Sequence, residues 1–162
     1  RLDRDTTGLT IVAKHALAGG ILGNAVAKRA IHRTYYAVCS GCTPACMRIS
    51  APIARKDAST IERCVDFKRG ENAVTDFIRI KYNPDNNLSL VKLRLLTGRT
   101  HQIRVHMKYI GFPLIGDFLY NPDYTYISRQ ALHSGRLVFT HPVTGQKMNL
   151  ISDIPSDMKS LF

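Results

Sequence analysis

A tight-turn signal between two alternating segments constrains this sequence more than any other feature. Residues 83–87 read Asn-Pro-Asp-Asn-Asn, and these residue types favour turns. Residues 88–96 alternate as a half-buried strand does, with an apolar face made of Val91, Leu93 and Leu95 and a charged face made of Lys92 and Arg94. Residues 75–82 place Ile78, Ile80 and Tyr82 on one face in strand fashion. The three segments together predict a β-hairpin.

Other segments predict more strands and two helices. The further strands are expected at residues 9–13, 34–39, 137–140 and 147–151, the last two in a second hairpin. The helices are expected over residues 15–31, where Gly19 and Gly20 weaken the prediction, and from Thr100 as N-cap to a stop at Gly111 and Pro113. Residues 40–69 read as a loop-rich region. We therefore expect one α+β domain over residues 1–162, with a mixed, largely antiparallel sheet flanked by a few helices.

The charge of the chain indicates a polyanionic partner. The sequence holds 23 Lys and Arg against 12 Asp and Glu, which gives a formal net charge of +11. A field of this sign concentrates nucleic acid near the surface, whereas a basic protein without such a ligand is the plain alternative. The sequence contains no apolar run of 18 residues that would predict a membrane span, and its first residues do not read as a signal peptide. We expect a cytoplasmic protein. Because the chain does not begin with Met, we expect a fragment or a processed product.

The cysteines are a weak candidate for a metal site. Cys39, Cys42 and Cys46 have the spacing C-x2-C-x3-C, and Cys64 stands alone 18 positions later. Zinc ribbons usually repeat a C-x2-C pair, which this chain does not do. We expect reduced thiols and no metal.

Two segments carry residues suited to catalysis or to binding an anion. Residues 1–8 read Arg-Leu-Asp-Arg-Asp-Thr-Thr-Gly, in which neighbouring cations favour an ionised carboxylate, although a charged turn before a strand has the same composition. Residues 97–107 read Thr-Gly-Arg-Thr-His-Gln-Ile-Arg-Val-His-Met and join a strand end to a helix start, where anions bind well. Tyr35 and Tyr36 add aromatic faces, of which at most one can face a ligand because strand neighbours alternate.

These segments, taken in order, resemble the RluA/RluD family of pseudouridine synthases along nearly the whole chain. Residues 1–8 match the HRLDxxTSG signature without its leading His and with Thr7 in place of Ser. Residues 34–41 match the YxAxxxG strand, and residues 97–107 match TGRTHQIRVHM. Residues 109–120 match YIGHPLIGDxxY with Phe112 in place of His, and residues 130–133 and 139–145 complete the pattern.

The resemblance implies a function and a role for each matched residue. It implies that Asp3, rather than Asp5, is the catalytic aspartate that attacks a flipped-out uridine in structured rRNA or tRNA. It also implies that Tyr35 and Arg104 are catalytic: Arg104 pairs with Asp3, and Tyr35 packs on the uracil and helps to remove the proton from C5. Arg1 is implied to fill the gap that the flipped base leaves in the RNA stack. The remaining expected RNA-binding residues are Arg99, His101, Gln102 and His106.

The family reaction is an isomerisation, so it implies no metal or organic cofactor. We expect RNA as the partner, a monomer, and no obligate protein partner. One alternative is a non-catalytic RNA-binding module on the same fold, because the chain starts inside the first motif and Asp3 lies near a chain end. Another is a basic interaction domain without an RNA partner.

Overall fold

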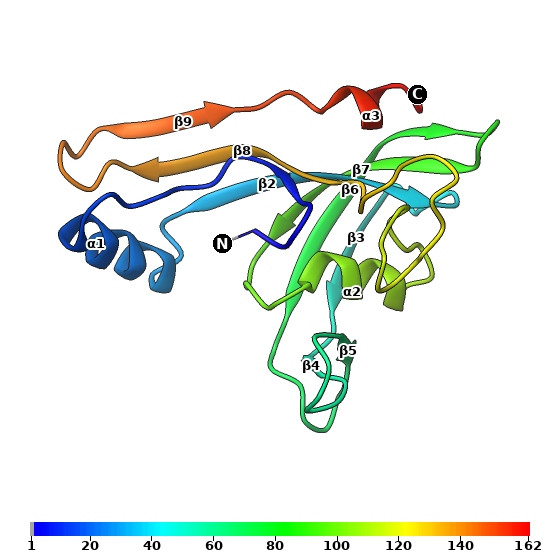
Figure 1. The fold of residues 1–162 in the computed structure, drawn as a ribbon, viewed down its shortest axis with the longest axis horizontal. Coiled ribbons are helices and arrows are strands. Elements are labelled where there is room, and N and C mark those ends of the chain that lie inside the picture. Colours follow the sequence, from blue (N-terminus) through cyan, green and yellow to red (C-terminus); the bar gives the residue numbers. More distant parts are fainter. Residues whose placement is uncertain (1) are drawn as a thin grey trace.

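A single twisted sheet with a projecting hairpin organises the protein (Figure 1). The structure, a computed structural model, describes residues 2–162. The helices are α1 (Ala16–Ala27), α2 (Gln102–Tyr109) and α3 (Ser156–Lys159). The strands are β1 (Thr7–Gly8), β2 (His32–Ser40), β3 (Cys46–Ser50), β4 (Ile53–Arg55), β5 (Arg63–Val65), β6 (Val74–Asn83), β7 (Leu88–Leu95), β8 (Leu132–Thr140) and β9 (Lys147–Ile151).

Within residues 2–162, seven strands form the main sheet in the order β1-β8-β2-β7-β6-β3, and β9 pairs with β8 beside β1. The pairing of β1 with β8 is parallel and the other pairings are antiparallel. Strands β4 and β5 form a separate two-stranded hairpin that projects below the sheet in Figure 1. The predicted α+β class with a mixed, largely antiparallel sheet is confirmed.

The β6–β7 hairpin forms as predicted, and its apolar stripe supplies the centre of the core. Val91 and Leu93 are buried, and Leu93 lies opposite Phe77 of β6. Helix α2 packs Ile103 and Met107 onto this face of the sheet. Ile78 and Ile80, by contrast, are about half exposed, because they lie away from the Phe77 face and a bulge follows Arg79.

Four details of the local prediction are wrong, each for a physical reason. Residues 9–13 form no strand, because the parallel ladder to β8 ends at Gly8, and Leu9 and Ile11 instead pack on α1 and β8. The region 40–69 contains β3, β4 and β5: β3 pairs with the distant β6, and β4 and β5 are only three residues each, too short for a clear alternation. Helix α1 ends at Ala27, before the residue Arg29 with a φ of 56°. The N-cap of α2 is His101 rather than Thr100.

Gly116 marks a close backbone approach beside the proposed site. Its φ is +67°, and a Cβ there would overlap the carbonyl oxygens of Arg129 and Ile127. Gly116→Ala should therefore lower the free energy of unfolding by more than about 2 kcal/mol. Gly20→Ala is the matched control, because Gly20 has open space around it in α1 and Ala should raise helix stability by up to about 1 kcal/mol. Urea unfolding of both variants measures the difference, and equal effects would contradict this account of Gly116.

Candidate active site

Arg104 lies at the centre of the candidate site. It is on α2 with its side chain only 1% exposed, and it forms a two-pronged hydrogen bond with Asp117: Nε and Nη2 each donate to a carboxylate oxygen at 2.7 Å. Burial would lower the pKa of Arg104, but the hydrogen bonds and charge of Asp117, with a further contribution from Asp3, raise it above its usual value. The guanidinium is therefore a fixed, permanent cation.

The loop after Asp117 shapes the surroundings of this cation. Oδ1 of Asp117 accepts hydrogen bonds from the backbone N–H groups of Leu119 and Tyr120, which orients the carboxylate. The rings of Phe118 and Tyr120 lie 5.3 and 5.0 Å from the guanidinium carbon of Arg104. Both distances suit cation–π attraction. The loop thus supplies both the counter-charge and the aromatic rings.

Asp3 occupies the open side of Arg104. Its Oδ2 lies 3.5 Å from Nη1 of Arg104, and its side chain is 20% exposed. Asp117 holds the other side of the guanidinium and is completely buried, so Asp3 is the carboxylate of the two that a ligand can reach. Arg104 therefore places an opposite charge beside the carboxylate that a ligand can reach.

The segment that carries Asp3 is held by the body of the protein. Gln130 donates a side-chain hydrogen bond to the carbonyl oxygen of Arg4. The Thr7 hydroxyl lies 2.9 Å from Nδ1 of His133, next to the β1–β8 pairing. Leu2 packs against the same apolar cluster as Tyr35 and Met107. These contacts position Asp3 although it is near the start of the chain.

Tyr35, on β2, lies near Asp3. Its side chain is buried, and burial raises the pKa of its phenol above the usual value. The charge of Arg33 opposes this shift, and that of Asp3 adds to it, which shows that the Asp3 carboxylate and the phenol are within electrostatic range. The hydroxyl is thus protonated at neutral pH. The structure brings together Asp3, Tyr35 and Arg104, which come from three separate motifs.

His101 connects this site to the β4–β5 hairpin. Its Nδ1 lies 2.9 Å from the hydroxyl of Tyr120, and that hydroxyl accepts a hydrogen bond from the backbone N–H of Arg63. Burial, and then the charge of Arg104, lower the pKa of His101, so it is neutral at pH 7. Burial raises the pKa of Tyr120 to about 12. His101 has a φ of 56°, a left-handed conformation that is uncommon for a residue with a side chain and often marks a functional site.

Comparison with known proteins bears on this arrangement. Residues 1–109 match the family described as RNA pseudouridylate synthase. The chain belongs to this family. It is 47% identical to the uncharacterized RNA pseudouridine synthase YjbO of Bacillus subtilis over 100% of this chain and 56% of that protein. It is 38% identical to the ribosomal large subunit pseudouridine synthase D of Zymomonas mobilis, over 100% of this chain and 54% of that protein.

A solved structure agrees with the family assignment. Human RNA Pseudouridylate Synthase Domain Containing 1 superposes with a TM-score of 0.83 at 26% identity, over 94% of this chain and 66% of that one. The chain spans about half the length of the curated relatives quoted above. The resemblance noted in the sequence is confirmed at the level of the family.

In this member of the family, the expected RNA-binding residues lie in different environments. Gln102 is buried. Its amide oxygen accepts hydrogen bonds from the Thr97 hydroxyl and the backbone N–H of Arg99, and its amide nitrogen donates to the carbonyl oxygen of Val74 and the hydroxyl of Thr75. His106 is fully buried between the Thr75 hydroxyl and the carbonyl oxygen of Ala51. Both side chains hold α2 against the sheet, so their burial does not favour contact with RNA. Arg99 is exposed and pairs with Glu71, whereas Arg1 lies outside the described residues.

The described part of the chain shows no gathered metal ligands and no membrane-crossing helix. Among residues 2–162 no group of three or more His, Cys, Asp or Glu side chains is arranged to hold an ion. The four cysteines of the chain, all in the part that the structure describes, form no disulfide; Cys39 is buried, and Cys42 and Cys46 are exposed. No helix in the same range is long and apolar enough to span a membrane.

Sequence reasoning gave no role to Asp117, Phe118 or Tyr120, although Asp117 and Tyr120 lay in a recognised motif. The signal that could have identified them is an acid and two aromatic residues within four positions, near a motif rich in cations. A local pattern could not show that this acid, rather than Asp3, holds Arg104 with two hydrogen bonds.

Breaking the buried pair should destabilise the protein strongly. Asp117→Asn leaves Arg104 buried with only the longer and partly exposed ion pair to Asp3, so the free energy of unfolding should fall by about 3–5 kcal/mol. Asp76→Asn removes a more exposed Arg–Asp pair of similar geometry, with Arg48, and should cost less than about 1 kcal/mol. Urea unfolding compares the two variants. Similar losses would show that burial of the Arg104 pair has no special weight.

Proposed function

We propose that this chain is the catalytic domain of an RNA pseudouridine synthase that converts uridine to pseudouridine in structured rRNA or tRNA. The observation that carries the proposal is the reachable carboxylate of Asp3 beside Arg104, a buried cation that Asp117 holds in place. A carboxylate can act as a nucleophile, and this cation holds it at a fixed position that a substrate can reach.

The reaction rearranges one nucleotide without gain or loss of atoms. Asp3 attacks either C1′ of the ribose or the uracil ring, and both routes break the bond between N1 and C1′. The base rotates, a bond forms between C5 and C1′, the proton on C5 leaves, and N1 takes up a proton. The carboxylate is then released. The scheme has no redox step, so it calls for no redox cofactor.

The target uridine must leave the RNA helix, because a stacked and paired base hides the atoms to be attacked. In our proposal the ring of Tyr35 packs on the flipped uracil, where a protonated phenol offers a neutral surface. Arg1 fills the vacated place in the stack, and the exposed Arg99 contacts the backbone. His101, a neutral partly buried donor near Arg104, assists in holding the nucleotide.

The runner-up function, a non-catalytic RNA-binding module, rested on a frayed N-terminus. The hydrogen bond from Gln130 to Arg4 and the β1–β8 pairing favour catalysis instead, because they hold the segment around Asp3. We further propose that the protein acts as a monomer in the cytoplasm, without an obligate protein partner.

Asp3→Asn should abolish the reaction. The asparagine keeps the size of the side chain but removes the nucleophilic charge, so we expect pseudouridine formation to fall at least a thousandfold, while binding to the same RNA changes little. The measurement is pseudouridine content of bulk rRNA and tRNA after incubation with the full-length protein.

Asp5→Asn is the matched control. Asp5 is exposed, lies two positions away, and has a φ of 63° that asparagine accepts readily. It should retain near wild-type activity. Activity that survives in Asp3→Asn, or that disappears equally in both variants, would overturn the assignment of Asp3.

A further inference from the structure

A basic cavity lies at the base of the β4–β5 hairpin, separate from the position of Asp3. Its volume is about 480 Å³ and it opens to solvent. Three segments line it: β4, the start of β5 with the turn after it, and the loop between β7 and α2. Its charged lining residues are Arg55, Arg63, Arg69, Arg99 and Glu71. Four guanidinium groups and one carboxylate give the cavity a net positive lining, which suits an anion.

The ion pairs of the cavity leave two of its cations without an acidic partner. Arg69 pairs with Asp66, and Arg99 pairs with Glu71. In the part of the chain that the structure describes, the guanidinium groups of Arg55 and Arg63 donate only to the backbone carbonyl oxygens of Ala58 and Ile61. The positive charges of these two side chains are therefore not neutralised by a neighbouring carboxylate in that part of the chain, and both guanidinium groups retain N–H donors for a ligand.

The cavity walls are fixed relative to the core. Ile53 and Ala73, at the base of the hairpin, pack with Val105 and Tyr120 in one buried cluster. At Gly70 the turn lies so close to Pro52 and Ile53 that a Cβ would overlap their backbone. The backbone that carries the arginines is thus held in place before a ligand arrives, which lowers the entropy lost on binding.

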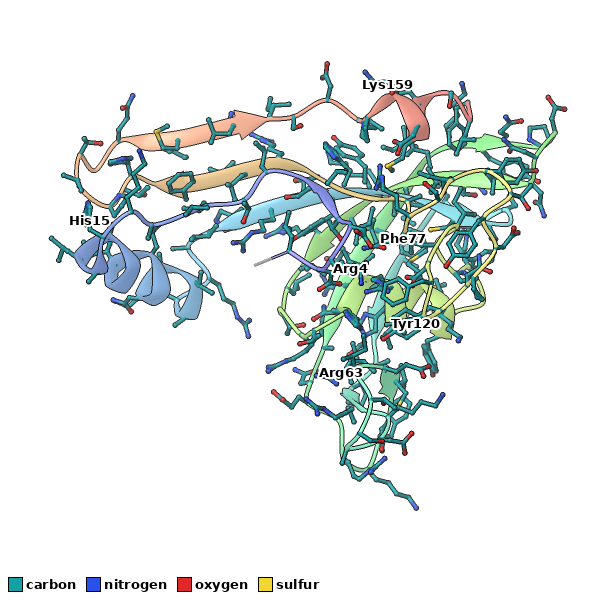
Figure 2. The ribbon with its side chains drawn as sticks, in the orientation of Figure 1. Arg4, His15, Arg63, Phe77, Tyr120 and Lys159 are labelled. Atoms are coloured by element: carbon teal, nitrogen blue, oxygen red, sulfur yellow. The ribbon has the colours of Figure 1, made fainter. Side chains whose placement is uncertain are left out.

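The cavity is also adjacent to the proposed active site. The backbone N–H of Arg63 donates to the hydroxyl of Tyr120, and the Tyr120 ring contacts the guanidinium that faces Asp3. Figure 2 shows Arg63 below Tyr120, on the side away from Arg4. A polymer whose flipped base reaches Asp3 would therefore pass the mouth of this cavity with its neighbouring backbone.

We propose that this cavity is a phosphate subsite that binds an RNA phosphodiester near the flipped uridine, mainly through Arg55 and Arg63. Guanidinium groups match phosphate oxygens with two parallel hydrogen bonds, and such contacts set the register of the nucleic acid. The proposal rests on the proposed function only in naming RNA as the polymer. Glu71 competes with the phosphate for Arg99 at the edge of the cavity.

The test is the salt dependence of RNA binding by the full-length protein. The probe is a labelled RNA stem–loop with a uridine-rich loop, and Asp3→Asn is the background, so that no chemistry occurs during the measurement. Each phosphate contact adds about 0.7–0.9 to the slope of log affinity against log salt concentration. Arg55→Gln with Arg63→Gln should therefore reduce the slope by about 1 to 2 and weaken binding several-fold.

Three matched variants separate a site from general charge. Arg48→Gln with Arg136→Gln removes the same charge from β3 and β8, outside the cavity, and should leave the slope near that of the background protein. Arg55→Lys with Arg63→Lys keeps both charges and should retain most of the slope. Glu71→Gln releases Arg99 from its exposed carboxylate partner and should tighten binding a few-fold.

An unchanged slope in the cavity glutamine variant would overturn the proposal, and so would an equal loss in the Arg48 and Arg136 variant. Thermal unfolding shows whether each variant is folded. If the cavity glutamine variant is not folded, Glu71→Gln keeps the proposal testable, because unchanged RNA binding in that variant would also contradict it. Pseudouridine formation by the protein with Asp3 intact is measured separately. A failure there would contradict the proposed function, whereas the slope alone decides the phosphate subsite.

Discussion

The buried ion pair between Arg104 and Asp117 is the interaction on which the proposed site depends. Removing two charges from water costs several kcal/mol each, so such a pair persists only with excellent geometry and further hydrogen bonds. Here the guanidinium makes two hydrogen bonds to Asp117, which in turn accepts from two backbone N–H groups. A cation held so firmly offers Asp3 a fixed electrostatic partner that need not move when a ligand binds.

The fold brings distant segments to this pair. The sheet places Tyr35 of β2 near Asp3, and β8 holds the segment of Asp3 through the short parallel pairing with β1. Helix α2 supplies Arg104, and the loop from Asp117 to Tyr120 supplies the counter-charge and the aromatic rings. Through Tyr120 the same loop contacts the β4–β5 hairpin, so a hydrogen bond from Arg63 links the proposed phosphate subsite to the proposed active site.

Local patterns predicted the elements that are made from neighbouring residues. The β6–β7 and β8–β9 hairpins form where turn residues and alternation indicated them. Strands β3, β4 and β5 were missed, because strands of three to five residues give too weak an alternation and β3 pairs with β6 across more than twenty residues. The burial of Gln102 and His106 could not be read from the sequence, since a polar residue on a helix looks the same in sequence whether it faces RNA or the core.

The sequence by itself determined the family and the identity of the central residues, because several motifs occurred in order and each named a residue type with suitable chemistry. Only the tertiary structure decided how these residues are paired. The resemblance implied only Asp3 as the partner of Arg104, and the structure gives the close, two-pronged contact to Asp117 and the longer one to Asp3. The physical reason is that ion pairing depends on distance and burial, which long-range packing sets. Asp3, the proposed nucleophile, is therefore the more accessible carboxylate of a three-residue charge arrangement whose buried members, Arg104 and Asp117, no local pattern could pair.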